Sequence, residues 1–124
     1  MAVESGRITR TREPLLPVRL TDDVVIDCLV DTGFSGALML PRSVVRELEM
    51  PVVAKEVFAT VGQRLFSANV CLTEIQWLGR RRMARVIVSD GFDSIIGTEM
   101  LDGHLLMIDY ARDTVKLTSE SVSR

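Results

Sequence analysis

The stretch Cys28-Leu29-Val30-Asp31-Thr32-Gly33-Phe34-Ser35-Gly36-Ala37-Leu38-Met39-Leu40 decides the fold of this chain. Its two apolar runs are typical of buried strands, and the polar residues between them predict a tight loop. That loop presents a carboxylate, a hydroxyl and a glycine at the end of a strand. At average composition, the tripeptide Asp31-Thr32-Gly33 arises by chance in only about a few per cent of chains of this length. A plain turn is the alternative, because all three residue types are common in turns.

A second motif, Ser94-Ile95-Ile96-Gly97-Thr98-Glu99-Met100-Leu101, follows later in the chain. It predicts a short apolar strand and then a helix that Thr98 caps and Gly103 ends. The order and separation of the two motifs resemble those of the retropepsin-like aspartic peptidases, over roughly residues 15–118. Residues 29–41 are similar to the bacterial members of that group.

This resemblance implies an all-β fold, mainly β with one or two short helices, in which one lobe closes as an acid-protease-like barrel over residues 14–118. It implies that Asp31 is catalytic, without a cofactor or a metal. It places Thr32, Gly33, Ile95, Ile96 and Gly97 as supports of the active-site loop. It also makes the hairpin tip at Thr60, Val61, Gly62 and Gln63 the flap that covers a substrate.

Peptide hydrolysis by carboxylates needs a base for the attacking water and an acid for the carbonyl oxygen. One aspartate cannot hold both states, and no second Asp-Thr-Gly or Asp-Ser-Gly occurs in the sequence. The chemistry therefore predicts a symmetric homodimer in which two Asp31 carboxylates face each other. At about 3 Å they would repel by roughly 5 kcal/mol at an effective dielectric near 20, so they should share one proton. The expected activity is an aspartic endopeptidase acting on extended polypeptides.

Phe34 departs from the family pattern, since retroviral enzymes usually carry Ala there and pepsin-like lobes carry Ser. A hydroxyl that could bind the outer carboxylate oxygen is therefore absent from that position, and Ser35 would replace it only if the backbone turned it inward. Two other functions stay open. One is a non-catalytic peptide-binding module with the same fold, and the other is a processing enzyme that acts on one partner alone.

Period-two apolar alternation predicts most of the remaining elements as strands. Residues 1–13 are expected to form a flexible arm, or an edge strand in a dimer, and residues 119–124 a tail. The predicted strands are 15–20, 24–30, 37–40, 52–59, 65–76, 83–89, 95–96, 105–109 and 114–118, with a helix over 43–49 and turns at 21–23 and 77–82.

Composition bears on the possible binding partners, on metal and disulfide sites, and on the location of the protein. Fifteen basic and seventeen acidic residues nearly cancel, which argues against nucleic-acid or membrane-surface binding. A single histidine, His104, excludes most metal and triad schemes and is expected at the surface near a helix end. Cys28 and Cys71 are expected to be free thiols rather than a disulfide. No apolar run approaches the ~20 residues of a membrane span, and residues 1–14 carry no signal-peptide core, so a cytoplasmic protein is expected.

Overall fold

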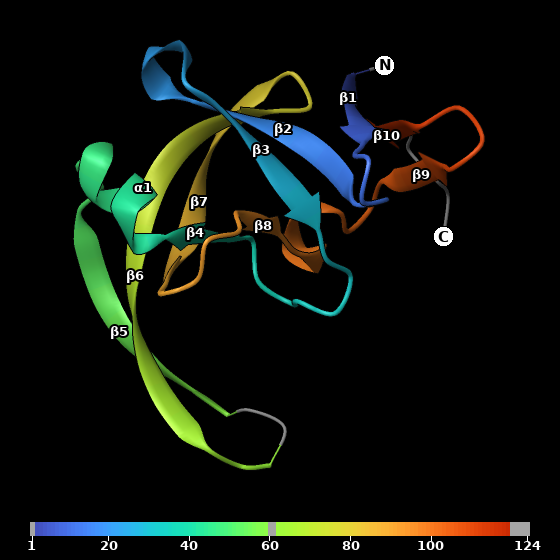
Figure 1. The fold of residues 1–124 in the computed structure, drawn as a ribbon. Helices are drawn as coiled ribbons and strands as arrows, with labels where there is room; N and C mark the ends of the chain where they lie inside the picture. Colours follow the sequence, from blue (N-terminus) through green and yellow to red (C-terminus); the bar gives the residue numbers. More distant parts are fainter. Residues whose placement is uncertain (1, 60–61, 120–124) are drawn as a thin grey trace.

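The computed structural model describes residues 2–59 and 62–119, which form one ten-stranded sheet with a short helix (Figure 1). The elements are β1 (Val3–Ile8), β2 (Pro14–Leu20), η1 (Thr21–Asp23), β3 (Val25–Val30), β4 (Leu38–Pro41), α1 (Arg42–Glu47), β5 (Val52–Ala59), β6 (Leu65–Trp77), β7 (Arg80–Ser89), β8 (Ile95–Ile96), η2 (Thr98–Met100), β9 (Leu105–Asp109) and β10 (Thr114–Thr118). The predicted all-β class is confirmed.

The strand order is β5-β6-β7-β4-β8-β3-β2-β1-β10-β9, and β6 pairs additionally with β2. That extra pairing joins Leu20 to Ile75 and closes six of the strands into a ring. Strand β6 is 13 residues long, so it can pair with β5 along one part and with β7 and β2 along another. Its first part pairs with β5 in a projecting hairpin, and its second part belongs to the ring.

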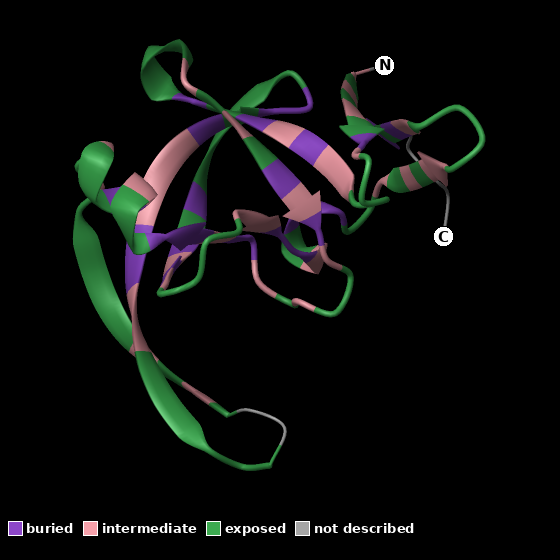
Figure 2. Cartoon of the chain, in the orientation of Figure 1, coloured by how far each residue is buried: buried purple, intermediate pink, exposed green. Residues whose placement is uncertain are grey.

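The core lies inside this ring. In β2 the buried side chains alternate, with Leu16, Val18 and Leu20 pointing inward. Trp77 is also buried, and its indole Nε1–H donates a 3.0 Å hydrogen bond to the carbonyl oxygen of Met100. Figure 2 shows the buried residues concentrated in the ring, whereas the β5–β6 hairpin is largely exposed.

The prediction that residues 1–13 form a flexible arm was wrong. Residues Val3–Ile8 form β1, which lies between β10 and β2 in the sheet of its own chain. The backbone of Gly6 approaches the Leu15 carbonyl so closely that a Cβ would collide with it. Strand pairing satisfies the backbone N–H and C=O groups that a free arm would leave to water, and Ile8 becomes buried.

Two predicted boundaries also change. The turn expected over 77–82 needs only Leu78 and Gly79, which have φ of 51° and 77°, so residues 80–82 belong to β7. The helix expected after Gly97 is one 3-10 turn, and no side chain caps it. Among the helices of the described residues, none is long and apolar enough to cross a membrane.

Candidate active site

Asp31 directly follows β3, at the point where that strand runs parallel to β8. The register pairs Leu29 with Ile95 and Val30 with Ile96. The backbone N–H of Asp31 then donates a 3.0 Å hydrogen bond to the carbonyl oxygen of Ile96. The Asp31 residue is half-buried while Thr32 and Gly33 are exposed, so the loop presents its polar groups at the surface of a rigid sheet.

The Asp31-Thr32-Gly33 loop is also ordered from within. The N–H of Gly33 donates to Asp31 Oδ1 at 2.9 Å, and the N–H of Phe34 donates to the Asp31 carbonyl oxygen at 3.1 Å. A Cβ on Gly33 would lie 3.2 Å from the same carboxylate oxygen. Glycine therefore lets the backbone amide approach and orient the carboxylate.

The segment after β8 supports the loop from below. Gly97 donates its N–H to the Ala37 carbonyl at 2.9 Å, and Thr98 donates to the Phe34 carbonyl at 2.8 Å. A Cβ on Gly97 would lie 2.6 Å from the Phe34 carbonyl oxygen and closer still to that of Gly36. The structure thus brings together all six predicted loop residues: Asp31, Thr32, Gly33, Ile95, Ile96 and Gly97.

The ring of Phe34 packs against Gly36 and Gly97. A Cβ on Gly36 would lie 2.6 Å from Phe34 Cζ, and one on Gly97 would lie 2.6 Å from Phe34 Cδ2. The residue that departs from the family pattern therefore fills the space that its neighbouring glycines leave open. Ser35, beside it, is exposed.

The β5–β6 hairpin curves away from the ring and passes below the loop that follows β3 (Figure 1). The register continues to the pair Ala59 and Leu65, and Phe58 stacks on Phe66 with 5.5 Å between ring centroids. Two of the predicted flap residues, Thr60 and Val61, lie outside the described residues. The other two, Gly62 and Gln63, are exposed and have φ of 100° and 62°, as a tight turn requires.

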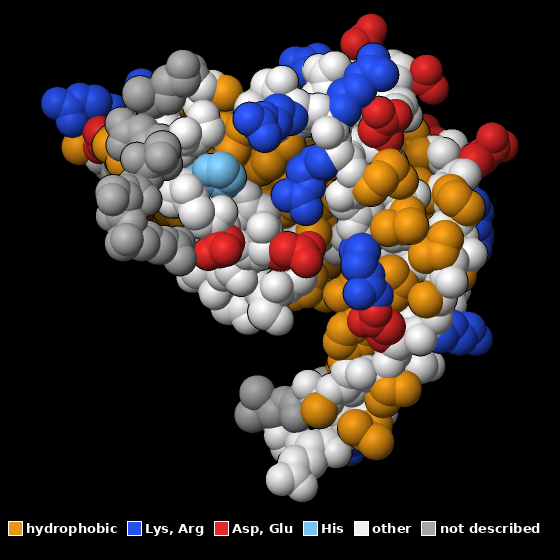
Figure 3. All heavy atoms as spheres, turned by 180° about the vertical axis from the view of Figure 1, so that it is seen from behind, with side chains coloured by type: hydrophobic (Ala, Val, Ile, Leu, Met, Phe, Trp, Pro, Cys, Tyr) orange, Lys and Arg blue, Asp and Glu red, His pale blue; other side chains and the backbone are white. Residues whose placement is uncertain are grey.

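A cavity of about 380 Å³ separates the hairpin from the loop. Its apolar lining combines ring and hairpin residues, and an ion pair between Glu56 and Arg85 crosses its wall. The space-filling view shows the hollow between the body and the hairpin (Figure 3). The residues that line it are Gly33, Phe34, Ser35, Gly36, Ala37, Met39, Glu56, Phe58, Ala59, Phe66, Arg85, Ile87 and Glu99.

A shallower groove of about 600 Å³ starts on the other side of the loop, at Thr32, and extends to Leu106. His104 lines it and is half-buried, so its expected position at the surface is only partly correct. Within the described residues, its Nδ1 atom is buried without a hydrogen-bond partner. The groove leaves the Thr32 side of the loop open.

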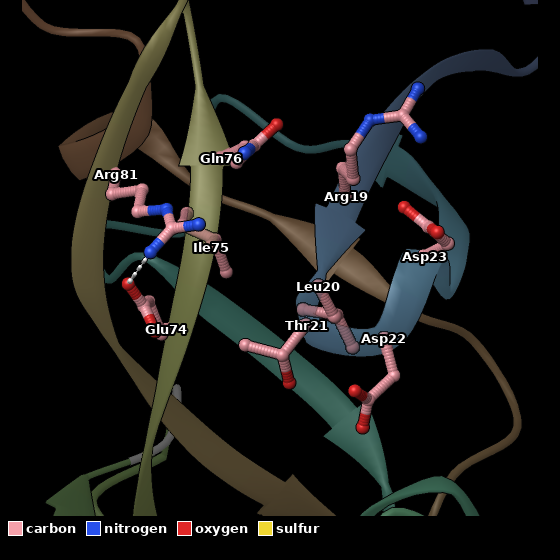
Figure 4. A pocket seen from close by; sticks show the side chains of 9 residues that line it. All are labelled: Arg19, Leu20, Thr21, Asp22, Asp23, Glu74, Ile75, Gln76 and Arg81. Carbon is pink, nitrogen blue, oxygen red and sulfur yellow. Dashed lines mark ion pairs between the residues drawn. The ribbon is translucent and has the colours of Figure 1, made fainter.

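Another pocket lies far from the loop, where β2 meets β6, and none of the predicted site residues lines it (Figure 4). It is polar, and on its β6–β7 side Arg81 and Glu74 form an ion pair of 3.9 Å. The side chains of Asp22 and Asp23 point in different directions, so they do not converge on one ligand. Consistently, no group of three metal-ligating side chains gathers anywhere in residues 2–59 and 62–119.

Both cysteines are buried free thiols, as predicted. Burial raises the pKa of Cys28 to about 12, and the negative charge of Asp27 adds to that rise. Burial likewise raises the pKa of Cys71. Neither thiol is activated as a nucleophile.

No known family model matches the chain. A protein of Archaeoglobus fulgidus described as uncharacterized is 26% identical over an alignment of 114 positions that covers 86% of this chain and 87% of that protein. A solved retropepsin-like aspartic protease from Rickettsia conorii is similar over 93% of this chain and 89% of its own, with a TM-score of 0.67 and 18% identity.

Two viral structures extend the likeness. The EIAV protease in complex with the inhibitor HBY-793 matches 75% of this chain and 88% of its own, with a TM-score of 0.57 and 22% identity. The simian foamy virus protease matches 72% of this chain and 92% of its own, with a TM-score of 0.53 and 15% identity. The chain therefore has the retropepsin-like fold.

Proposed function

We propose that this protein is an aspartic endopeptidase that acts as a homodimer on extended polypeptides. The observation that carries the proposal is the position of Asp31, whose backbone is hydrogen-bonded to Ile96 and whose carboxylate is oriented by the Gly33 amide. The loop is thereby held rigidly beside an apolar cavity, as preorganised catalysis requires.

In this mechanism the ionised carboxylate of one protomer takes a proton from water, and the water oxygen attacks the scissile carbonyl carbon. The protonated carboxyl group of the other protomer donates its proton to the carbonyl oxygen. Collapse of the tetrahedral intermediate then breaks the C–N bond, and the amine nitrogen receives a proton from the carboxyl group that took one from water. One hydroxyl of the intermediate returns its proton to the carboxylate that had protonated the carbonyl oxygen, so the products are a carboxylic acid and an amine, and the two side chains again share one proton.

The need for two protomers follows from the single Asp-Thr-Gly sequence. Thr32 is exposed at the end of the loop, and the groove that begins there is open as far as Leu106. A second copy that brings its own Asp31 to this side would complete the pair of carboxylates. The hydroxyl of Thr32 would then be available to bond across the axis.

The substrate would lie between the loop and the β5–β6 hairpin. Its backbone would pass along the exposed loop residues Thr32, Gly33 and Ser35. An apolar side chain would enter the cavity formed by Met39, Phe58, Phe66 and Ile87. We propose that residues 60–63 of the hairpin serve as the flap over it.

The test is cleavage of a diverse peptide library between about pH 4 and 7 at a concentration where sedimentation shows a dimer. The wild type is compared with Asp31→Asn and with Asp93→Asn, which removes an exposed carboxylate outside the loop. Cuts that persist in Asp93→Asn and vanish in Asp31→Asn support the peptidase. Cuts that persist in Asp31→Asn overturn it, and peptides that bind without being cut indicate the non-catalytic binding module.

A further inference from the structure

The charges that line the cavity do not balance. Among the described residues that line the cavity, Arg85 is the only one with a positive charge, and it forms an ion pair with Glu56. Glu99 is the remaining charged group. Its carboxylate has no hydrogen bond or ion pair with any described residue, so the cavity carries one uncompensated negative charge.

Glu99 is held in place by the active-site loop itself. Its backbone N–H donates to the Gly36 carbonyl at 3.3 Å, and the preceding residue, Thr98, donates to the Phe34 carbonyl at 2.8 Å. Glu99 lines both the cavity beside Gly33 and the groove that starts at Thr32. Glu99 therefore stands at the boundary between the substrate cavity and the groove where the second protomer is proposed to dock.

We propose that Glu99 makes the site selective for polypeptides that carry Lys or Arg next to an apolar residue. The apolar side chain enters the cavity, and the basic side chain reaches the Glu99 carboxylate at its mouth. This inference rests on the proposed function, because it names the class of substrate that the same site accepts.

The expected preference is moderate. Glu99 is exposed, so water screens part of the attraction to a basic side chain. A charge-assisted hydrogen bond in this setting should favour a basic peptide by about three- to tenfold in kcat/KM. The preference should shrink between about 0.05 and 0.5 M salt because the screening length falls.

The experiment uses pairs of peptides that differ at one position beside the apolar residue, with Lys in one and its neutral isostere norleucine in the other. The wild-type protein should cut the Lys peptide about three- to tenfold more efficiently at low salt. In Glu99→Gln the ratio should fall to about one, and in Glu99→Lys a Glu-containing peptide should become the preferred one. Glu47→Gln, an equal charge change on an exposed residue of α1, should keep the wild-type ratio.

Binding separates this inference from the proposed function. The same peptides, labelled with a fluorophore, are titrated into the Asp31→Asn protein and into Asp31→Asn combined with Glu99→Gln. Tighter binding of the Lys peptide that Glu99→Gln removes supports the inference, even if the wild type cuts nothing and the peptidase is overturned. Equal treatment of the two peptides by the wild type, or a preference that survives Glu99→Gln, overturns the inference.

Discussion

The backbone N–H of Asp31 bonds to the carbonyl oxygen of Ile96 across 3.0 Å, which ties the proposed catalytic residue to a strand from the distant second motif. The position of the carboxylate therefore depends on β8 as much as on its own loop. Since β8 is only two residues long, Ile96 and the adjoining Gly97 carry most of that support.

Mixing of protomers tests whether each active site needs two copies of Asp31. Adding an equal amount of Asp31→Asn to the wild type should lower its activity to about one half, because mixed dimers are inactive and wild-type dimers become rarer. The measurement is peptide cleavage after the mixture has equilibrated above the dimer dissociation constant. Asp93→Asn added in place of Asp31→Asn should raise the total activity, and an unchanged rate with Asp31→Asn would mean that one chain suffices.

The pH profile tests the shared proton. Because one carboxyl group must be ionised and the other protonated, kcat/KM should rise and then fall as pH increases, with its maximum under mildly acidic conditions. Initial rates between about pH 3 and 8 show this curve directly, provided that circular dichroism finds the protein folded throughout. A rate that rises steadily into alkaline pH is incompatible with the paired carboxylates.

Gly97→Ala should destabilise the loop. The new Cβ would lie 2.6 Å from the Phe34 carbonyl oxygen and closer still to that of Gly36, so backbone must move. We expect a loss of roughly 3 kcal/mol in the free energy of unfolding. Urea denaturation measures it, with Gly91→Ala as the control, since a Cβ on that exposed glycine meets the Ser89 hydroxyl at 3.2 Å. Equal stabilities of the two variants would show that the loop tolerates a side chain at Gly97.

Trp77→Phe should cost about 1–3 kcal/mol of unfolding free energy. The substitution removes the indole N–H that binds the Met100 carbonyl at 3.0 Å, and it leaves that acceptor unpaired in the core. Tyr110→Phe changes an exposed ring and should stay within about 0.5 kcal/mol of the wild type. Chemical denaturation monitored by circular dichroism compares them, and a neutral Trp77→Phe would mean that another donor satisfies Met100.

The buried thiol of Cys28 should weaken the fold at high pH. Its pKa is raised to about 12 in the folded chain from an ordinary value of 9.0, so the unfolded chain releases the proton first. The stabilisation is complete below about pH 9 and is lost as pH rises toward 12, by at most about 1.4 kcal/mol per pH unit. Comparing urea unfolding of the wild type and Cys28→Ala from about pH 8 to 10.5 reveals this slope. Parallel curves would exclude Cys28 as its source.

Elements whose own residues carry a clear apolar pattern could be predicted from the local sequence alone. The alternation in β2 and the apolar run before Asp31 identify their strands, and the loop residues come together as the two motifs indicate. Strand β1 was missed because its main partner, β10, lies at the other end of the chain. Nothing within residues 3–8 shows that such a partner exists.

Other features depend on three-dimensional placement. The arginines at 80–82 look like a solvated turn, yet Leu78 and Gly79 complete that turn by themselves. His104 is half-buried because the groove forms around it. The role proposed for Glu99 depends on the pairing of Glu56 with Arg85, two residues whose meeting across β6 no sequence pattern signals.

The pairing of β1 with β10 has a consequence for synthesis on the ribosome. Val3 emerges from the ribosome long before Thr118, yet the two residues are partners in the sheet. Until β10 has been translated, β1 has only its short contact with β2, so one of its edges stays unpaired. The nascent chain thus carries an open strand edge from the emergence of β1 until that of β10, and a chaperone that shields such edges would act during that interval.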